Sequence, residues 1–233
     1  MDATARLAQY LRTHQTFVGK VVDFDPNTDL LFQFDFTSAN TELSADIVGD
    51  TDKFTSYINQ KLANSKRRYG IGGYMEHRTV YARSSHFDTD GEPRRLHLGV
   101  DIWARAGTPV YSPLEATVHS FHDNNNFGDY GPTIILAHHL DRLDLYSLYG
   151  HLSRKSLDGL VVGQPINANQ QIGVFGDVTE NGQWPPHLHF QLMFDMEGCA
   201  GDYPGVCRYS EKEKYVKNIP DPGLILHERL TGF

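Results

Sequence analysis

The spacing of apolar residues along the chain changes at about residue 75. Residues 2–13 and 50–68 carry apolar side chains three or four positions apart, which predicts two amphipathic helices. The second segment also begins with Asp and Thr and ends with basic residues, which are helix start and stop signals. Between them, residues 30–36 alternate and are rich in Phe, so they predict a strand. We therefore expect an α+β region over residues 1–74.

From residue 75 onward the helical spacing disappears, and short β-type runs alternate with turn-rich stretches. These runs predict strands at residues 78–83, 96–103, 116–121, 133–140, 143–152, 172–176 and 187–194. Short strands with regular turns indicate an antiparallel sheet or sandwich. The predicted fold class is mainly β, and α+β overall. The expected divisions are an N-terminal extension at 1–74, a β domain at 75–205 and a tail at 206–233 packed on that domain.

Composition and charge narrow the classes of function. The 233 residues are 39% hydrophobic and 21% charged, as in ordinary globular proteins, and the formal net charge is −8. Nucleic-acid binding is not expected, because the only basic run is "KRR" at 66–68. Membrane spanning is not expected either, because no apolar run approaches about 18 residues. The oligomeric state is left open.

The N-terminus and the cysteines bear on the compartment. The first 17 residues lack a cationic start followed by an apolar core, so they do not have the pattern of a secretory signal. The expected location is cytoplasmic as the sequence stands, or extracellular or periplasmic if a leader has been removed. Cys199 and Cys207 are expected to be plain thiols, with a disulfide as the alternative.

The stretch "HLHF" places His187 and His189 two positions apart in an alternating segment. In a strand, these two histidines and Gln191 share one face, while apolar residues occupy the other. A polar row of this kind is either a solvent face or the lining of a cleft. Because no charged residue accompanies the pair and the stiff "WPP" precedes it, we favour a cleft.

Three His-x-x-x-Asp spacings compete as partners for that pair. His86/Asp90 lies in a polar loop and His119/Asp123 lies at a strand end, whereas His97/Asp101 lies within an apolar β segment. A His and an Asp are costly to bury unpaired, and sharing a cation would compensate them. His151 is a further polar residue at the end of an apolar run, and the adjacent His138 and His139 face opposite ways on a strand.

Four motifs in this order, "HLGVD", "AGTPV", "YGHL" and "HLHF", resemble the lysostaphin-type zinc metallopeptidases, which cleave peptidoglycan peptides. The resemblance covers roughly residues 95–195. It implies the duplicated-hybrid-motif type of β fold and a Zn²⁺ cofactor. Residue by residue, it implies His97, Asp101 and His189 as metal ligands and His151 and His187 as catalytic histidines. It leaves open which of these two histidines is the general base.

The sequence is compatible with three functions. The first is a zinc endopeptidase cutting a peptide bond, with peptidoglycan cross-links as the family-typical substrate. The second is a cytoplasmic zinc hydrolase acting on a small amide or metabolite, because the N-terminus lacks the pattern of a secretory signal. The stretches "GIGGYMEHR" and "FGDYGPTIIL" also resemble a metallopeptidase-like module of large fused bacterial proteins, and this resemblance implies a cytoplasmic role. The third is a non-catalytic metal-binding module on the same scaffold. In each case residues 1–74 could cap the cleft.

Overall fold

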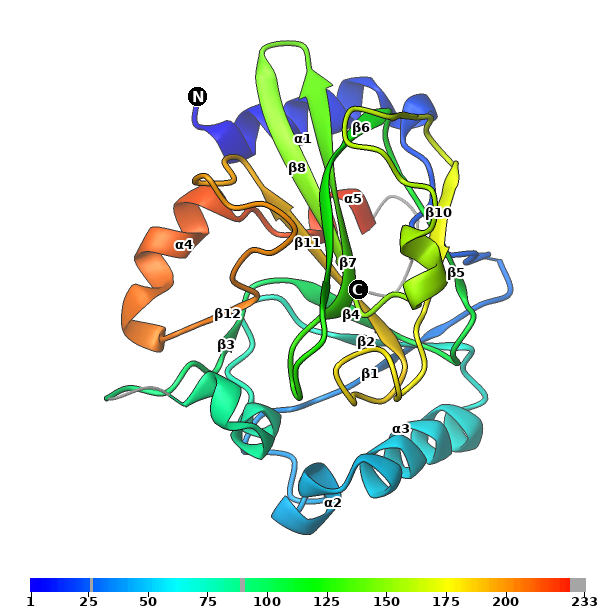
Figure 1. Cartoon of the computed structure of the whole chain (residues 1–233), viewed down its shortest axis with the longest axis vertical. Helices are drawn as coiled ribbons and strands as arrows, with labels where there is room; N and C mark the ends of the chain where they lie inside the picture. The colour runs from blue at the N-terminus through cyan, green and yellow to red at the C-terminus, as the bar shows by residue number, and fades with distance from the viewer. Residues whose placement is uncertain (26, 89–90, 227–233) are drawn as a thin grey trace.

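Strands from both halves of the chain join one sheet in the computed structural model, which describes residues 1–25, 27–88 and 91–226 (Figure 1). In chain order, the sheet contains β1 (Leu31–Gln33), β2 (Tyr69–Gly72), β4 (Val100–Trp103), β6 (Ala116–Asn124), β7 (Gly131–Leu140), β8 (Leu143–Gly150), β9 (Pro165–Ile166) and β11 (His187–Met193). Their order across the sheet is β1-β2-β4-β11-β8-β7-β6-β9.

Two small sheets accompany the large one. They pair β5 (Pro109–Tyr111) with β10 (Gln171–Val174), and β3 (Leu96–His97) with β12 (Val206–Cys207). In the described residues every strand pairing is antiparallel except the parallel pair β1–β2. The predicted fold class, a mainly antiparallel β protein with N-terminal helices, is therefore confirmed.

Helices lie toward both ends of the chain: α1 (Ala3–Thr13), α2 (Ala45–Gly49), α3 (Thr51–Ser65), α4 (Lys212–Asn218) and α5 (Gly223–Leu226). The two predicted helices correspond to α1 and α3. Asp2 caps α1 by accepting from the backbone N–H of Ala5, and Asp50 caps α3 by accepting from the backbone N–H groups of the first turn. These caps explain why each helix begins where it does. Residues 212–226 also form α4 and α5, although the spacing after residue 75 predicts no helix.

The strand predicted at residues 78–83 is wrong, because Thr79–Arg83 form a 3₁₀ helix. The reason lies in tertiary contacts, which override β propensity here. The Arg78 side chain is drawn inward by ion pairs with Glu76 and Asp101, and it is almost fully buried. The strand predicted at 30–36 is real but shorter, as β1. Residues 227–233 of the predicted tail lie outside the described residues.

The two faces of β11 are both buried. Leu188, Phe190 and Leu192 belong to the main apolar core, which α1 and α5 also cover. The opposite face carries the predicted polar row of His187, His189 and Gln191, each at most 3% exposed. The three polar residues therefore share one face, as the alternation predicts. This face is buried within the protein and is not open to solvent.

The N-terminal region packs beside this polar face. Phe36 and Phe54 form a second apolar cluster with Trp103 of β4 and with Trp184, just before β11. Figure 1 shows α2 and α3 next to β1 and β2, at one end of the sheet. The division of the chain at residue 74 and a capping role for residues 1–74 stay predictions. Among the described helices, none is both long and apolar enough to cross a membrane.

Candidate metal centre

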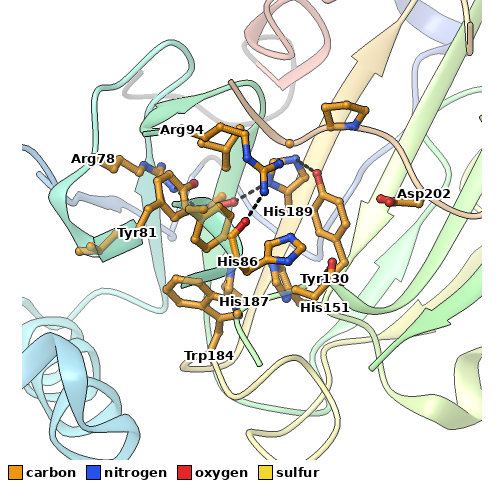
Figure 2. A pocket seen from close by; sticks show the side chains of 18 of the residues that line it. Arg78, Tyr81, His86, Arg94, Tyr130, His151, Trp184, His187, His189 and Asp202 are labelled. Carbon is orange, nitrogen blue, oxygen red and sulfur yellow. Dashed lines mark hydrogen bonds and ion pairs between the residues drawn. The ribbon is translucent and has the colours of Figure 1, made fainter. Parts of the chain in front are cut away.

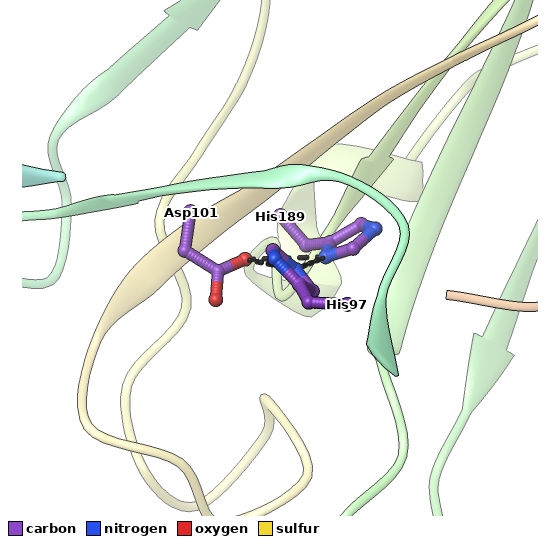
Figure 3. A group of neighbouring side chains, drawn as sticks. All are labelled: His97, Asp101 and His189. Atoms are coloured by element: carbon purple, nitrogen blue, oxygen red, sulfur yellow. Dashed lines mark hydrogen bonds and ion pairs between the residues drawn. The ribbon is translucent and has the colours of Figure 1, made fainter. Parts of the chain in front are cut away.

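Three side chains from separate strands converge on one point, as Figure 3 shows. His97 Nε2 lies 3.0 Å from His189 Nδ1. The Asp101 Oδ1 atom lies 3.2 Å from the first of these nitrogens and 3.1 Å from the second. All three residues are buried, and they form the one group with metal-ligand potential found in the described residues.

The local fold explains this convergence. His189 of β11 lies directly opposite Asp101 of β4 in the antiparallel register. His97 ends β3 four positions earlier, and Gly99 lies between the two strands. A side chain at Gly99 would bring its Cβ within 2.6 Å of the His189 ring, so the glycine of "HLGVD" lets the two segments approach closely.

Hydrogen bonds assign the protonated nitrogen of each ring. His97 Nδ1 lies 2.9 Å from the Gly73 carbonyl oxygen, to which it donates. His189 Nε2 lies 3.0 Å from Gln191 Oε1 and donates to it, while the Gln191 amide nitrogen donates to the Pro204 carbonyl and fixes the amide orientation. The nitrogens that face each other, His97 Nε2 and His189 Nδ1, are therefore both unprotonated.

This arrangement fits a metal ion. Two imidazole lone pairs and a carboxylate oxygen face one another with no proton between them, so only a cation can satisfy all three. Zinc bound by nitrogen and oxygen at about 2.0–2.1 Å in a tetrahedron has ligand-to-ligand edges of about 3.3–3.4 Å. The observed edges of 3.0–3.2 Å are close to this value. Two histidines and one carboxylate also match a catalytic zinc site, which leaves one position open.

Arg78 holds the second oxygen of the aspartate. Its guanidinium Nη1 pairs with Asp101 Oδ2 and lies 3.2 Å from the Tyr81 hydroxyl, and its Nε pairs with Glu76 at 2.7 Å. Asp101 Oδ1 is thereby left to face the histidines. Arg78 and Gln191 are site residues that the sequence did not predict. Gln191 could have been found, because it shares a face with the two histidines, whereas no spacing marks Arg78.

The protonation states suit metal ligands. Burial disfavours the Asp101 carboxylate, but His97 and Arg78 outweigh burial and hold its pKa well below the usual range. Burial lowers the pKa of His97 to about 4, and the Arg78 charge acts in the same direction. At neutral pH the site therefore has an ionised carboxylate and a neutral imidazole, the forms that bind metals.

His151 and His187 lie beside the three ligands. Their ring centroids are 4.1 Å apart. His151 Nδ1 donates to the Asn181 carbonyl at 2.9 Å, and His187 Nδ1 donates to the Pro185 carbonyl at 2.7 Å. Each ring is thus left with an unprotonated Nε2. Burial lowers the pKa of His187 to about 4 and lowers that of His151 as well, so both rings are neutral at physiological pH.

The backbone holds His151 in an unusual conformation. Its φ of 63° lies in the left-handed region, which is uncommon for residues other than glycine. Its N–H donates to the Tyr130 carbonyl at 2.8 Å, and its own carbonyl accepts from the Gly176 N–H at 2.9 Å. Strained backbone that neighbouring hydrogen bonds maintain is a feature of functional sites.

A cavity opens beside these side chains, as Figure 2 shows. Its wall includes Asp101, His151, His187 and His189, together with Tyr130, Arg94, Asp202 and aromatic residues. Trp103 stacks on His187 with 4.0 Å between ring centroids, which fixes the orientation of that imidazole. The structure therefore brings all five predicted site residues together. Four of them line the cavity, and the fully buried His97 lies against Asp101 and His189. Their individual roles stay predictions.

The rival spacings do not form sites in the described residues. His119 contacts Ser120, whereas Asp123 pairs with Arg154. His86 lines the cavity, but Asp90 lies outside the described residues. His138 is buried and His139 is exposed, as predicted for adjacent strand residues. Cys199 and Cys207 are free thiols, also as predicted.

Comparisons with known proteins point to one family. Residues 95–199 match the model described as Peptidase family M23. An L-Ala–D-Glu endopeptidase of Bacillus subtilis (strain 168) is 32% identical over 150 residues, which are 60% of this chain and 44% of that protein. The chain thus spans less than half the length of this relative.

Solved structures give partial matches. A zinc-containing peptidase from Vibrio cholerae is 26% identical over 42% of this chain and 27% of its own, with a TM-score of 0.34. The catalytic domain of the antimicrobial peptidase lysostaphin from Staphylococcus simulans is 23% identical over 69% of this chain and 97% of its own, with a TM-score of 0.39.

Proposed function

Because residues 95–199 match the model of Peptidase family M23, we propose that the chain is a zinc-dependent endopeptidase that hydrolyses an amide bond within peptidoglycan peptides. One observation carries the proposal: His97 Nε2, His189 Nδ1 and Asp101 Oδ1 lie within 3.0–3.2 Å of one another, while the other nitrogen of each ring faces an oxygen acceptor. The Bacillus subtilis relative, an L-Ala–D-Glu endopeptidase by name, supports a peptide substrate.

The metal would be held by His97, Asp101 and His189. When bound, zinc would polarise the scissile carbonyl and lower the pKa of a water molecule to about 7. Gln191 and the Gly73 carbonyl keep the ligand nitrogens unprotonated and correctly turned. Arg78 keeps Asp101 ionised and directs Oδ1 toward the site.

His151 and His187 would handle the proton. Each presents an unprotonated Nε2 at the cavity, because its Nδ1–H is engaged by a backbone carbonyl. One of them takes the proton of the attacking water as general base. Once protonated, that imidazolium can donate to the tetrahedral oxyanion or to the leaving amine nitrogen. A neutral imidazole in this tautomer cannot donate from Nε2, so proton uptake must come first.

Tyr130 supplies a hydrogen-bond donor. Burial raises the pKa of its phenol well above the ordinary value, so the hydroxyl stays protonated. The hydroxyl oxygen lies 3.3 Å from the His189 Nε2–H group and lines the cavity. Its proton is therefore free to donate to a carbonyl oxygen of the substrate, and this hydrogen bond strengthens as negative charge develops there.

The test combines metal analysis with hydrolysis. Purified protein is expected to contain one zinc per chain and to cleave purified peptidoglycan or its stem peptides, with activity abolished by a chelator and restored by zinc. His189→Ala should lose zinc and more than about 100-fold of the activity. Removing a hydrogen-bond partner of a metal ligand typically costs about 10- to 100-fold, and removing the ligand itself should cost more. Exposed His139→Ala is the matched control.

Three outcomes would contradict the proposal. Protein without tightly bound divalent metal at neutral pH would refute the metal site. Zinc-loaded protein that cleaves small amides but no peptidoglycan peptide would refute the proposed substrate. Zinc binding with no hydrolysis of any amide would indicate a binding module.

A further inference from the structure

We propose that Arg94 forms a carboxylate-binding subsite in the cavity, so that the substrate is an acidic peptide with a free carboxylate close to the scissile bond. This inference rests on the proposed function for its reaction. The carboxylate-binding step itself depends only on the cavity and on the partners of Arg94.

Arg94 belongs to the same cavity as the metal centre. It lines the wall together with Asp101, His187 and His189. Figure 2 shows Arg94 with the two histidines. The residue comes from the connection that leads into β3, the strand that carries His97. A substrate group held by Arg94 would therefore lie in the cavity that holds the scissile bond.

The arginine has more donors than partners. A guanidinium has five N–H donors. In the described residues, one Nη2 group donates to the His86 carbonyl, while the buried Nε has no hydrogen-bond partner. The guanidinium carbon also lies 5.7 Å from the Phe87 ring centroid, within the range of a cation–π contact. Leaving a buried donor without a partner costs free energy, and an acceptor on a bound ligand would remove that cost.

Two other arginines near this wall differ from Arg94 because each has a carboxylate partner. Arg78 is paired with Asp101 and Glu76, so its charge is already neutralised. Arg95 points elsewhere and pairs with Asp88 at 2.5 Å. Within the described residues, Arg94 has no such carboxylate within ion-pair distance. Its positive charge is therefore the one on the cavity wall that remains for a ligand.

Positive and negative side chains lie at different parts of the cavity wall. Asp129 and Asp202 also line it, and Figure 2 shows Asp202 on the other side of His189 and Tyr130 from Arg94 in that view. A carboxylate placed near these aspartates would be repelled, whereas one placed at Arg94 would be attracted. The asymmetry would orient a peptide in the cavity as well as bind it.

Chemistry selects a carboxylate rather than a neutral amide. The planar guanidinium fork matches the two oxygens of a carboxylate and can form two parallel N–H···O bonds. An amide of the same shape offers one acceptor oxygen and an NH₂ group that faces the donors. The site should therefore distinguish Glu from Gln, two side chains of nearly equal size.

The experiment uses pairs of peptides that differ only by Glu or Gln next to the scissile bond, on either side of it. Wild-type protein loaded with zinc should show a kcat/KM about 10- to 100-fold higher for the better Glu peptide, since hydrogen bonds to charged groups contribute about 1.5–3 kcal/mol. Arg94→Gln should abolish this preference and keep kcat/KM on the Gln peptide within about threefold. Arg94→Lys should restore part of the preference, because the charge returns without the fork.

Arg95→Gln is the matched control, because this neighbouring arginine is already paired outside the cavity. It should keep the Glu preference. Equal activity of the wild type on both peptides would overturn the inference, and so would an Arg94→Gln variant that loses the same factor on both. Thermal unfolding of each variant shows whether a loss of activity is caused by misfolding. If Arg94→Gln does not fold, Arg94→Lys is compared with the wild type instead.

A binding measurement separates this inference from the proposed function. If the wild type hydrolyses neither peptide, calorimetric titration with the same Glu and Gln peptides still tests the subsite. Tighter binding of the Glu peptide that Arg94→Gln removes would support the subsite although the proposed reaction fails. Equal binding of both peptides would overturn the subsite by itself.

Discussion

His138 of β7 and the four histidines of the site are each at most 5% exposed, yet their ring nitrogens have different partners. Burial lowers the pKa of His138 to about 4, as it does for His97 and His187. His138 Nδ1 donates to the Glu115 carbonyl at 2.9 Å, and its Nε2 lies 2.7 Å from the Ser147 hydroxyl. Both of its nitrogens therefore have protein partners.

The rings at the cavity are satisfied on one side only. His151 and His187 each donate from Nδ1 to a backbone carbonyl, and their Nε2 atoms have no partner among the described residues. Burial and a lowered pKa are thus shared by a structural histidine and by the candidate catalytic ones. The difference lies in the free nitrogen at a cavity, which is the better sign of chemistry in this molecule.

Removing an imidazole whose Nε2 has no protein partner should have the largest effect on activity. His151→Ala is expected to lower kcat about 10²- to 10⁴-fold, the usual contribution of a positioned general acid or base. Zinc content should be unchanged, because His151 is not among the three converging ligands. Kinetics and metal analysis of the same preparation check this prediction. Retained activity, or zinc loss, would mean that His151 has been assigned the wrong role.

Removal of an orienting partner should have a smaller effect. Gln191→Leu takes away the acceptor of the His189 Nε2–H group but leaves all three ligands in place. Zinc affinity should fall about 10- to 100-fold, because the ring loses both its preferred tautomer and its orientation. Competition with a coloured chelator measures the affinity. The exposed Gln171→Leu is the control, and equal affinities for the two variants would contradict the role of Gln191.

Removal of the structural histidine should change stability alone. Below about pH 6.5 the unfolded chain protonates His138, while the folded chain keeps it neutral until the pH falls to about 4. The wild type should therefore lose about 3 kcal/mol of stability from this group as the pH falls through that window. His138→Gln should lack this part of the loss.

Denaturant unfolding of the metal-free proteins at pH 7 and at pH 4.5 measures the difference, because the other histidines contribute equally to both. Identical pH dependence of the two proteins would show that His138 carries no such penalty. The zinc-loaded variant should also keep its activity, unlike His151→Ala, and this contrast is the sharpest form of the comparison between the two histidine groups.

The spacing of residues within a single segment predicted those parts of the site that one segment forms. The alternation in "HLHFQL" predicts that His187, His189 and Gln191 share a face, and β11 has that arrangement. The Asp-capped start of α3 was also visible in the sequence. Such features depend on neighbours a few residues away, so the sequence contains the information directly.

Arg78 shows where local patterns fail. "RTVYAR" alternates like a strand, but the guanidinium is pulled toward Asp101, 23 residues later, and the segment becomes a 3₁₀ helix. Leaving the buried Asp101 carboxylate without this partner would cost about 3–5 kcal/mol, which exceeds a propensity difference of about 1 kcal/mol. No spacing rule expresses that choice, because it depends on which segments meet in space.

The sequence by itself determined the β character of the domain, the faces of its strands and, through four ordered motifs, the five residues that the fold brings together at the site. Only the tertiary structure decided which nitrogen of each ring stays free. The acceptors that settle this are the backbone carbonyls of Gly73, Asn181 and Pro185 together with the Gln191 side chain. Every residue but proline has the same N–H and C=O groups, so a carbonyl becomes a specific partner only when packing places it against one ring nitrogen.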